Sequence, residues 1–406
     1  MSRPLSRVVI VGSSLAGLQA AESLRAAAYA GHITMVGEER HAPYDRPPLS
    51  KQLLSGSWDP GRTRLRPGDA IDGLGLDWRL GLAAVALDPE RRQVRLADGS
   101  VEDYDAVVIA TGTTPRQVPN PLRLSGIHTL RTLDDAVALR TALDAEPRVV
   151  VVGGGFIGAE VAAEARRRSL PVTMVEALPV PLSRGLGSRL GQMCADLHVA
   201  QGVHLRCGVG VSGFEGDGRL ERVALSDGSV IPADLAVVGI GSEPATAWLE
   251  SSGLTIADGV VCDPFCRASR PGVYAAGDVA RWRNPLFDEV VRIEHWTNAR
   301  EQAAAAIATL LADHGLGPEP APYAPVPYVW SDQYGRRIQV AGRTVGAEEV
   351  TVVHHEPDNG STLALYRFGA RLGGVAGINA SRRLLPFRTM IAARVGWDQA
   401  LAAAAA

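Results

Sequence analysis

The sequence predicts an α/β protein with two similar strand–helix–strand domains, followed by a smaller α+β domain at the C-terminus. Two segments, beginning at Arg7 and Arg148, each read as a strand, a glycine-rich loop, a helix and a second strand, which is the pattern of a βαβ unit. Residues 94–112 align without gaps on residues 223–241, which indicates that the two domains share one plan. A chain of 406 residues is long enough for two or three domains.

The elements of the two βαβ units follow from runs of apolar residues. In the first unit we expect a strand over Arg7–Val11, a helix over Leu18–Ala28 and a strand over Ile33–Val36. In the second unit we expect a strand over Arg148–Val152, a helix that ends near Arg168 and a strand over Val172–Glu176.

Residues 94–112 and 223–241 form an internal repeat. Each copy places an Asp–Gly hairpin turn before a buried strand that ends in glycine. Such a strand end is where a chain leaves a nucleotide-binding domain, so we expect crossings near residues 112–119 and 241–244. A short strand ending at the Gly277-Asp278 turn and a helix over Asn298–Leu311 then return the chain to the first domain.

The proline-rich stretch 317–327 reads as a linker to the C-terminal domain. Beyond it we expect antiparallel strands within Val329–Gly342, Val350–His354, Thr362–Phe368 and Leu372–Ile378. A helix over Ser381–Val395 and a frayed alanine tail over Ala402–Ala406 follow. The predicted domains are residues 1–115 with 244–322, residues 116–243, and residues 323–406.

Composition excludes several classes of protein. A net charge of −3 gives no general reason to expect a nucleic acid partner. No apolar run is long enough to span a bilayer and the N-terminus lacks the layout of a signal peptide, so we expect no membrane partner and a cytoplasmic location. The four cysteines, at positions 194, 207, 262 and 266, lack zinc-ligand spacing and are expected to be reduced thiols, with no metal site.

The second glycine loop matches the complete dinucleotide-binding fingerprint. Gly153 allows the turn, Gly155 lets the backbone approach a pyrophosphate, and Gly158 packs the helix on the strand. Glu176 closes the following strand, where its carboxylate can accept both hydroxyls of the adenosine ribose or can remain a solvated acid. A carboxylate there repels a 2′-phosphate, which favours NADH over NADPH, although Arg166–Arg168 and Arg184 oppose this preference.

The first glycine loop departs from the fingerprint at one position. Gly12 and Gly17 are present, but Ser14 replaces the middle glycine, so we expect a weakened dinucleotide site. Glu38 is the candidate for binding the ribose of this site.

Lys51 is the one lysine among 41 basic residues, which raises the question of what an ammonium does there. Taken together, six segments resemble the FAD-dependent, NADH-dependent ferredoxin reductases of bacterial cytochrome P450 and Rieske dioxygenase systems. These segments are Gly12–Gly17, the Pro43–Lys51 stretch PYDRPPLSK, Ala110–Gly112, Gly153–Glu160, Ala276–Asp278 and Val329–Gln333. The resemblance spans the chain and implies a glutathione-reductase-like fold, with FAD on the first unit and NADH on the second.

The resemblance also implies which residues contact FAD. Carried onto matching positions, these contacts fall at Ala16, Glu38, Arg46, Lys51, Ala84, Thr111, Arg131, Asp278 and Trp296, beside the loop residues Gly12, Ser14, Gly17 and Gly112. Asp278 can bind the ribityl chain from its Gly–Asp turn, or can simply cap a helix.

The catalytic set that the resemblance implies is Lys51, Glu160 and Trp330. The Lys51 ammonium is expected near flavin N5 and O4, balanced by the Glu160 carboxylate. No cysteine occurs before Cys194, so the thiol relay of disulfide reductases is missing and electrons must leave the flavin directly. Trp330 and Trp296 are expected to line the dimethylbenzene edge, with core packing as the alternative role for each.

The implied partner is a small acidic [2Fe–2S] ferredoxin, which would in turn supply a P450 or Rieske oxygenase. Three arginine clusters could receive it, or could be ordinary solvated surface: Arg62, Arg64 and Arg66; Arg336 and Arg337; and Arg382, Arg383 and Arg388. The rival interpretations are a rubredoxin reductase or NADH oxidase of the same fold, and an interaction protein similar to apoptosis-inducing factor that binds FAD and NADH.

Overall fold

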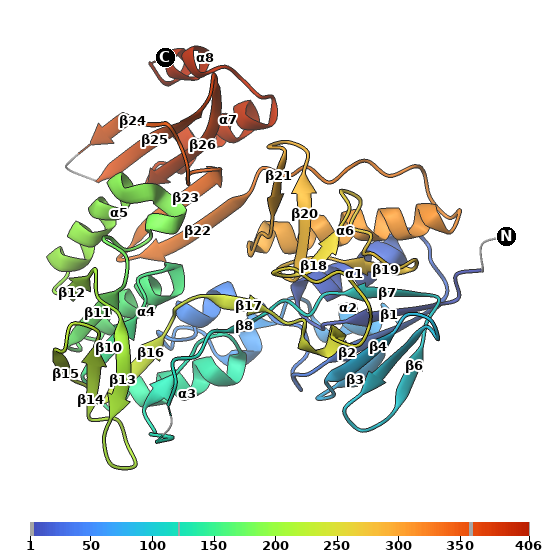
Figure 1. The fold of residues 1–406 in the computed structure, drawn as a ribbon, viewed down its shortest axis with the longest axis horizontal. Coiled ribbons are helices and arrows are strands. Elements are labelled where there is room, and N and C mark those ends of the chain that lie inside the picture. The colour runs from blue at the N-terminus through green and yellow to red at the C-terminus, as the bar shows by residue number, and fades with distance from the viewer. Residues whose placement is uncertain (1–3, 121, 357–359, 406) are drawn as a thin grey trace. The chain divides into compact units, whose positions relative to one another are not determined.

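The computed structural model describes residues 4–120, 122–356 and 360–405 (Figure 1). The chain divides into two compact units. Unit 1 comprises Met1–Asp45, Thr63–Thr114 and Glu243–Pro327, and unit 2 comprises Arg46–Arg62, Pro115–Ser242 and Tyr328–Ala406. The predicted three-domain division stays a prediction.

Unit 1 is built around a five-stranded parallel sheet in the order β19–β7–β1–β2–β3. These strands are β1 (Arg7–Val11), β2 (His32–Gly37), β3 (Asp77–Leu80), β7 (Ala106–Ile109) and β19 (Val273–Ala275). The first βαβ unit is confirmed: helix α1 (Leu15–Ala26) connects β1 to β2, which pair in parallel.

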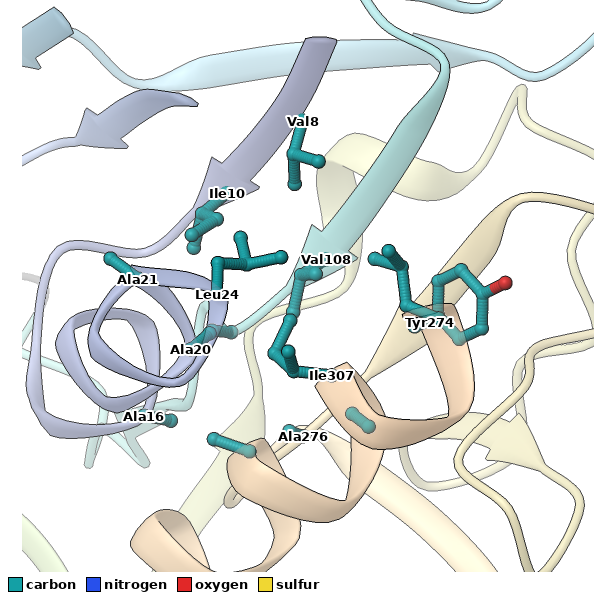
Figure 2. Close-up of a cluster of buried hydrophobic side chains, with 14 of the residues drawn as sticks. Val8, Ile10, Ala16, Ala20, Ala21, Leu24, Val108, Tyr274, Ala276 and Ile307 are labelled. Carbon is teal, nitrogen blue, oxygen red and sulfur yellow. The ribbon is translucent and has the colours of Figure 1, made fainter. Parts of the chain in front are cut away.

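Both faces of this sheet are covered. Val8 and Ile10 point to one face, where α1 and α6 (Trp296–Asp313) pack, and Figure 2 shows Leu24 and Ile307 from these helices beside them. The intervening residues Val9 and Val11 lie in a separate cluster on the other face, as the alternation of strand side chains requires. The remaining elements of unit 1 are α2 (Gly68–Asp72), β4 (Ala84–Asp88), β5 (Gln93–Leu96), β6 (Val101–Asp103), η3 (Ala247–Leu249), β18 (Val260–Cys262), β20 (Ala280–Asn284) and β21 (Glu289–Val291).

Unit 2 contains the second parallel sheet, in the order β12–β11–β10–β16–β9. Its strands are β9 (Ile127–His128), β10 (Val149–Val152), β11 (Val172–Glu176), β12 (His204–Cys207) and β16 (Leu235–Val238). Its helices are η1 (Pro47–Ser50), α3 (Leu133–Leu143), α4 (Phe156–Arg167) and α5 (Ser183–Ala200), and its antiparallel meander is β13 (Val211–Glu215), β14 (Arg222–Leu225) and β15 (Val230–Pro232).

The C-terminal part of unit 2 is an antiparallel sheet in the order β22–β23–β26–β25–β24. Its elements are β22 (Tyr328–Gln333), β23 (Arg336–Gly342), β24 (Glu349–Glu356), β25 (Ser361–Phe368), β26 (Arg371–Ile378), α7 (Ser381–Ala392) and α8 (Trp397–Ala405). Leu186, Leu190 and Cys194 of α5 pack on this sheet, in one cluster with Ile338 and Tyr366. Helix α7 packs on β26 and β23.

Both Asp–Gly hairpins of the internal repeat are confirmed, with Gly99 at φ +88° and Gly228 at φ +83° between antiparallel strands. The expectation of a frayed tail is wrong for Ala402–Ala405, which belongs to α8, because alanine is the best helix former; Ala406 lies outside the described residues. Among the described residues, no helix has the length and apolar character needed to cross a membrane.

Candidate functional site

The first glycine loop joins β1 to α1 in unit 1. A Cβ on Gly12, whose φ is +117°, would lie 2.1 Å from the Ala110 carbonyl oxygen. A Cβ on Gly17 would lie 1.8 Å from the Gly12 carbonyl oxygen, so both positions require glycine. Ser14 is the N-cap of α1 in an extended conformation. Since the first N–H groups of a helix have no partner within it, the start of α1 can bind a pyrophosphate.

The register of unit 1 gathers the other predicted FAD contacts along one edge of its sheet. Val11 pairs with both Val36 and Ile109, and Ile109 pairs with Ala275. The segments that leave these parallel strands are therefore neighbours, and they carry Gly12, Glu38, Thr111, Gly112 and Asp278. The carboxyl edge of such a sheet is where nucleotides bind.

The Gly277-Asp278 turn lies against the start of α1. A Cβ on Gly277 would come within 3.2 Å of the Ala16 Cβ, and the Gly277 N–H donates to Gln302 Oε1 at 2.9 Å. Strand β20 follows the turn, so the alternative that Asp278 caps a helix is wrong. The residues present therefore fit an extended dinucleotide: glycines where a Cβ would collide, free helix N–H groups and an acid in the adjoining turn.

The surroundings of three predicted FAD contacts in unit 1, Thr111, Trp296 and Ala84, are as follows. Thr111 Oγ1 donates to the Ala245 carbonyl at 2.9 Å, next to Gly112 at φ +69°. Trp296 is the first residue of α6, and its Nε1 donates to Asp45 Oδ1 at 2.7 Å. Ala84 is the half-buried first residue of β4.

The second glycine loop joins β10 to α4 in unit 2. A Cβ on Gly153 would lie 2.4 Å from the Gly239 carbonyl oxygen, and one on Gly158 would lie 2.1 Å from the Gly153 carbonyl oxygen. Gly155 is different: it is the N-cap of α4, and a Cβ there would meet no atom of the described residues within 4 Å. Gly155 thus leaves room for a ligand directly before the helix N-terminus.

Glu176 ends β11 beside this loop. Its Oε2 accepts from the Gly154 N–H at 2.6 Å and its Oε1 accepts from the Leu178 N–H at 2.7 Å. The carboxylate is held at the position from which the fingerprint acid binds ribose. Arg184 is an exposed residue of the first turn of α5. Arg46 Nη1 donates to the Arg131 carbonyl at 2.5 Å, so two predicted FAD contacts lie together.

Lys51 and Glu160 form the predicted ion pair. Lys51 Nζ lies 2.7 Å from Glu160 Oε2, and the two side chains are only 15% and 5% exposed. Lys51 Nζ also donates to the Pro47 carbonyl at 3.1 Å. Helix α4, which carries Glu160, packs against η1, which directly precedes Lys51. The pair is a fixed charge arrangement within unit 2.

Two serines complete the surroundings of Glu160 and were not predicted. Ser50 Oγ donates to Oε2 at 2.5 Å, and Ser331 Oγ donates to Oε1 at 2.6 Å. Short hydrogen bonds of this kind fix the orientation of the Glu160 carboxylate. The sequence held a weak signal: both serines lie in the segments that carry the family resemblance, and one of them directly precedes Lys51.

The other candidate residues occupy varied surroundings. Trp330, on β22, stacks with Tyr328 at 6.0 Å between ring centroids. Of the arginine clusters, Arg66 pairs with Glu22 at 2.7 Å and Arg337 pairs with Asp332 at 2.8 Å, whereas Arg382 is exposed on α7.

The cysteines are free thiols, and three of the four are buried. Burial raises the pKa of the Cys194 and Cys266 thiols to about 12, which makes them unreactive. Among the described residues, no group of three or more His, Cys, Asp or Glu side chains could hold a metal ion.

Comparison with known proteins gives matches over nearly the whole chain. Rhodocoxin reductase of Rhodococcus erythropolis is 37% identical over 387 residues, covering 95% of this chain and 89% of the relative. The ferredoxin–NAD(+) reductase subunit of the benzene 1,2-dioxygenase system of Pseudomonas putida is 37% identical, with coverages of 96% and 93%. The crystal structure of the covalent putidaredoxin reductase–putidaredoxin complex matches with a TM-score of 0.92 and 33% identity, over 98% of this chain and 96% of that chain.

These matches confirm the glutathione-reductase-like fold class and the resemblance on which it was predicted. Residues 6–303 match the family model described as pyridine nucleotide-disulphide oxidoreductase, and residues 328–406 match the model described as reductase C-terminal. The chain therefore belongs to the pyridine nucleotide-disulphide oxidoreductase family and carries a reductase C-terminal domain.

Proposed function

We propose that this protein is an FAD-containing, NADH-dependent ferredoxin reductase. It passes a hydride from NADH to FAD and then one electron to each of two [2Fe–2S] ferredoxins, so that NADH and two oxidised ferredoxins give NAD⁺, a proton and two reduced ferredoxins. The ferredoxin in turn supplies a P450 or Rieske oxygenase. The observation that carries the proposal is the Lys51–Glu160 pair in a chain with no cysteine before Cys194. Relatives named as ferredoxin reductases support the acceptor.

FAD binds to unit 1 and NADH to the glycine loop of unit 2. For FAD, the support is the glycine loop after β1 together with Glu38, Thr111, Gly112 and Asp278 along the carboxyl edge of the sheet. For NADH, the support is the open space at Gly155 and the carboxylate of Glu176. The ribose hydroxyls of NADH donate to the remaining lone pairs of the Glu176 carboxylate, and a 2′-phosphate would be repelled.

Lys51 supplies positive charge to the flavin. The bound flavin accepts a hydride and releases the electrons singly. The Lys51 ammonium would stabilise the negative charge that FAD gains on reduction, and Glu160 keeps that ammonium in place. Arg46 and Arg131 assist by binding the same cofactor, and Trp330 provides an aromatic surface where electrons leave.

The acidic ferredoxin docks on exposed arginines of the C-terminal domain, which include Arg382 and Arg383 of α7. Opposite charges accelerate the encounter of the two proteins. We also propose a cytoplasmic location, because the four cysteines are free thiols and NADH is an intracellular reductant.

The test is a comparison of acceptors. The purified protein is expected to be yellow, with about one non-covalent FAD per chain, and to transfer electrons from NADH to an acidic [2Fe–2S] ferredoxin such as putidaredoxin. Rubredoxin and oxygen, assayed at matched concentrations, are expected to give much lower kcat/KM values. Preference for rubredoxin or oxygen would assign one of the rival reductase activities instead. Binding of FAD and NADH without turnover of any acceptor would favour an interaction protein.

A further inference from the structure

A line of hydrogen-bonding side chains leads away from Glu160 through the interior of unit 2. Ser331 Oγ donates to Glu160 Oε1 at 2.6 Å, and Gln333 Nε2 donates to Ser331 Oγ at 3.1 Å. Ser331 is fully buried and Gln333 is 1% exposed. Buried polar side chains are costly unless they are paired, so two of them in succession on one strand require an explanation.

Strand geometry places both side chains on the side of β22 that faces Glu160. Residues two apart on a strand point to the same face, which aligns Ser331 with Gln333 and leaves Trp330 and Asp332 on the other face. Helix α4 packs against β22, which brings Glu160 to this buried face.

The far end of the line is a buried histidine and a tyrosine. His198, on α5, is fully buried, and its Nδ1 lies 2.7 Å from the Tyr334 hydroxyl. The two rings also meet edge to face, with centroids 5.2 Å apart. Tyr334 is half-buried, so the line reaches toward the protein surface at this residue.

Gln333 and His198 complement each other. Gln333 Oε1 and His198 Nε2 are buried, and neither has a partner at hydrogen-bonding geometry among the described residues. One is an acceptor and the other can carry a proton. Burial lowers the pKa of His198 to about 4, and the neighbouring Gln333 side chain partly opposes that shift. His198 is therefore neutral near pH 7.

The direction of every hydrogen bond follows from the carboxylate. Glu160 can only accept, so Ser331 gives it its single hydroxyl proton and must itself accept from the Gln333 amide. The link between Gln333 and His198 is not at hydrogen-bonding geometry in this structure, and a small side-chain movement would let the Gln333 carbonyl oxygen accept from His198 Nε2–H. In that tautomer, His198 Nδ1 accepts from the Tyr334 hydroxyl.

The backbone at Tyr334 indicates that its side chain has a specific role. Tyr334 and Gly335 form the two-residue turn between β22 and β23, with φ values of +53° and +72°. Asn–Gly and Asp–Gly are the sequences such turns favour, because a bulky residue at positive φ is strained. A tyrosine is placed here at a conformational cost, and its hydrogen bond and ring contact with His198 offset that cost.

We propose that Ser331, Gln333, His198 and Tyr334 form a directed line of polar side chains that holds Glu160 oriented toward Lys51, so that these four are positioning residues for the hydride-accepting site. The kinetic consequence rests on the proposed function, whereas the structural consequence does not. The other groups that face the chain are Lys51 and Ser50 at Glu160, and Arg166 of α4, whose charge acts on Tyr334.

Because the sequence contains a single lysine, the proposed role of these four residues can be tested without measuring activity. In FAD-loaded protein labelled with ¹⁵N-lysine, Lys51 gives one side-chain ammonium signal, and its hydrogen exchange rate reports how firmly Glu160 holds it. Ser331→Ala and Gln333→Leu are expected to raise that rate at least threefold. Tyr334→Phe, which removes one oxygen atom near the surface and keeps the ring, is expected to raise it by a smaller factor of about two.

Tyr366→Phe is the matched control. Tyr366 lies on β25 of the same sheet and donates to the Leu186 carbonyl at 2.6 Å, outside the chain. Tyr366→Phe removes one hydroxyl group, as Tyr334→Phe does, and is expected to leave the exchange rate of the Lys51 ammonium unchanged. Equal exchange rates in wild type, Tyr334→Phe and Ser331→Ala would overturn the inference. If Ser331→Ala does not fold, Tyr334→Phe against Tyr366→Phe decides.

A kinetic measurement separates the inference from the proposed function. In anaerobic stopped-flow experiments, Ser331→Ala is expected to lower the rate of flavin reduction by NADH about tenfold, with the KM for NADH unchanged. The rate falls because Glu160 loses the hydroxyl that orients its carboxylate toward Lys51. Wild-type flavin that NADH does not reduce would contradict the proposed function, while the exchange rates would still decide the inference.

Discussion

Lys51 Nζ lies 2.7 Å from Glu160 Oε2, although the two residues are 109 positions apart in the sequence. The contact ties the segment after η1 to the first half of α4. Buried ion pairs add little to stability when compared with apolar residues of the same size. The pair is therefore better explained by the charge that it places than by the energy that it contributes to folding.

Glu176 is expected to set the choice between the two nicotinamide cofactors. Glu176→Gln removes the negative charge while keeping one acceptor for the neighbouring backbone N–H groups. The ratio of kcat/KM for NADH to that for NADPH is expected to fall roughly tenfold, as for one charged hydrogen bond of ~1.4 kcal/mol. Steady-state kinetics with both nucleotides measure the ratio, with Glu221→Gln as the control. A wild-type preference for NADPH would refute the assignment.

Gly155 is expected to be needed for the ligand rather than for the fold. Its φ of −74° suits any residue, and an added Cβ would meet no described atom within 4 Å. Gly155→Ala should keep the melting temperature of the wild type and raise the KM for NADH several-fold, because the methyl group occupies space that the pyrophosphate needs. Gly213→Ala, where a Cβ is equally unobstructed, is the control. An unchanged KM would contradict the placement of NADH.

Two histidines with lowered pKa values predict a loss of stability in acid. Burial lowers the pKa of His198 and of His295 to about 4, against about 6.5 in an unfolded chain. The unfolded state therefore binds more protons between these values, and stability is complete above about pH 6.5 and falls as the pH drops toward 4. At pH 5 each histidine lowers the free energy of unfolding by about 2 kcal/mol relative to neutral pH.

The measurement is the free energy of unfolding or the melting temperature as a function of pH. His198→Gln should reduce the slope between pH 6.5 and 4 by about one proton, whereas His204→Gln, at an exposed position, should not. Equal slopes in wild type and His198→Gln would show that His198 does not titrate as burial requires.

Arg382, an exposed arginine on α7, is expected to speed association with the ferredoxin. Arg382→Ala should lower kcat/KM for an acidic ferredoxin by a few-fold at low salt, with a smaller effect at high salt, because ions screen the attraction. Arg95→Ala, at an exposed position on β5, is the control. An effect that is independent of salt would argue for a structural role of Arg382 instead.

The sequence predicted the regular parts of the fold well because they depend on local pattern. The strands Arg7–Val11 and Val172–Glu176 have the expected bounds, since runs of apolar residues leave few alternatives. Long-range contacts were less accessible. Residues 46–62 join unit 2, where Arg167 and Arg168 donate to the carbonyls of Ser55 and Leu54. No local pattern indicates such contacts.

The residues of the candidate site likewise include some that the sequence identified and some that it missed. Lys51 and Glu160 were identified by family resemblance, and the structure contains their ion pair. Ser331 and Gln333 were missed because serine and glutamine on a strand usually face water, and their burial depends on α4 and α5 packing against β22 and its neighbours. The kink of α5 at Gly187, with φ +71°, likewise depends on packing that the sequence pattern does not reveal.

The most direct test of this account is the flavin midpoint potential of Lys51→Met, measured by spectroelectrochemistry beside the rate of reduction by NADH. If the ammonium stabilises the charge that the flavin gains, the potential and the rate should both fall, while FAD binding largely survives because its other contacts lie elsewhere. Lys51→Arg should be intermediate, since it keeps the charge but spreads it over a planar group. An unchanged potential and an unchanged rate in Lys51→Met would contradict the role assigned to Lys51 and Glu160.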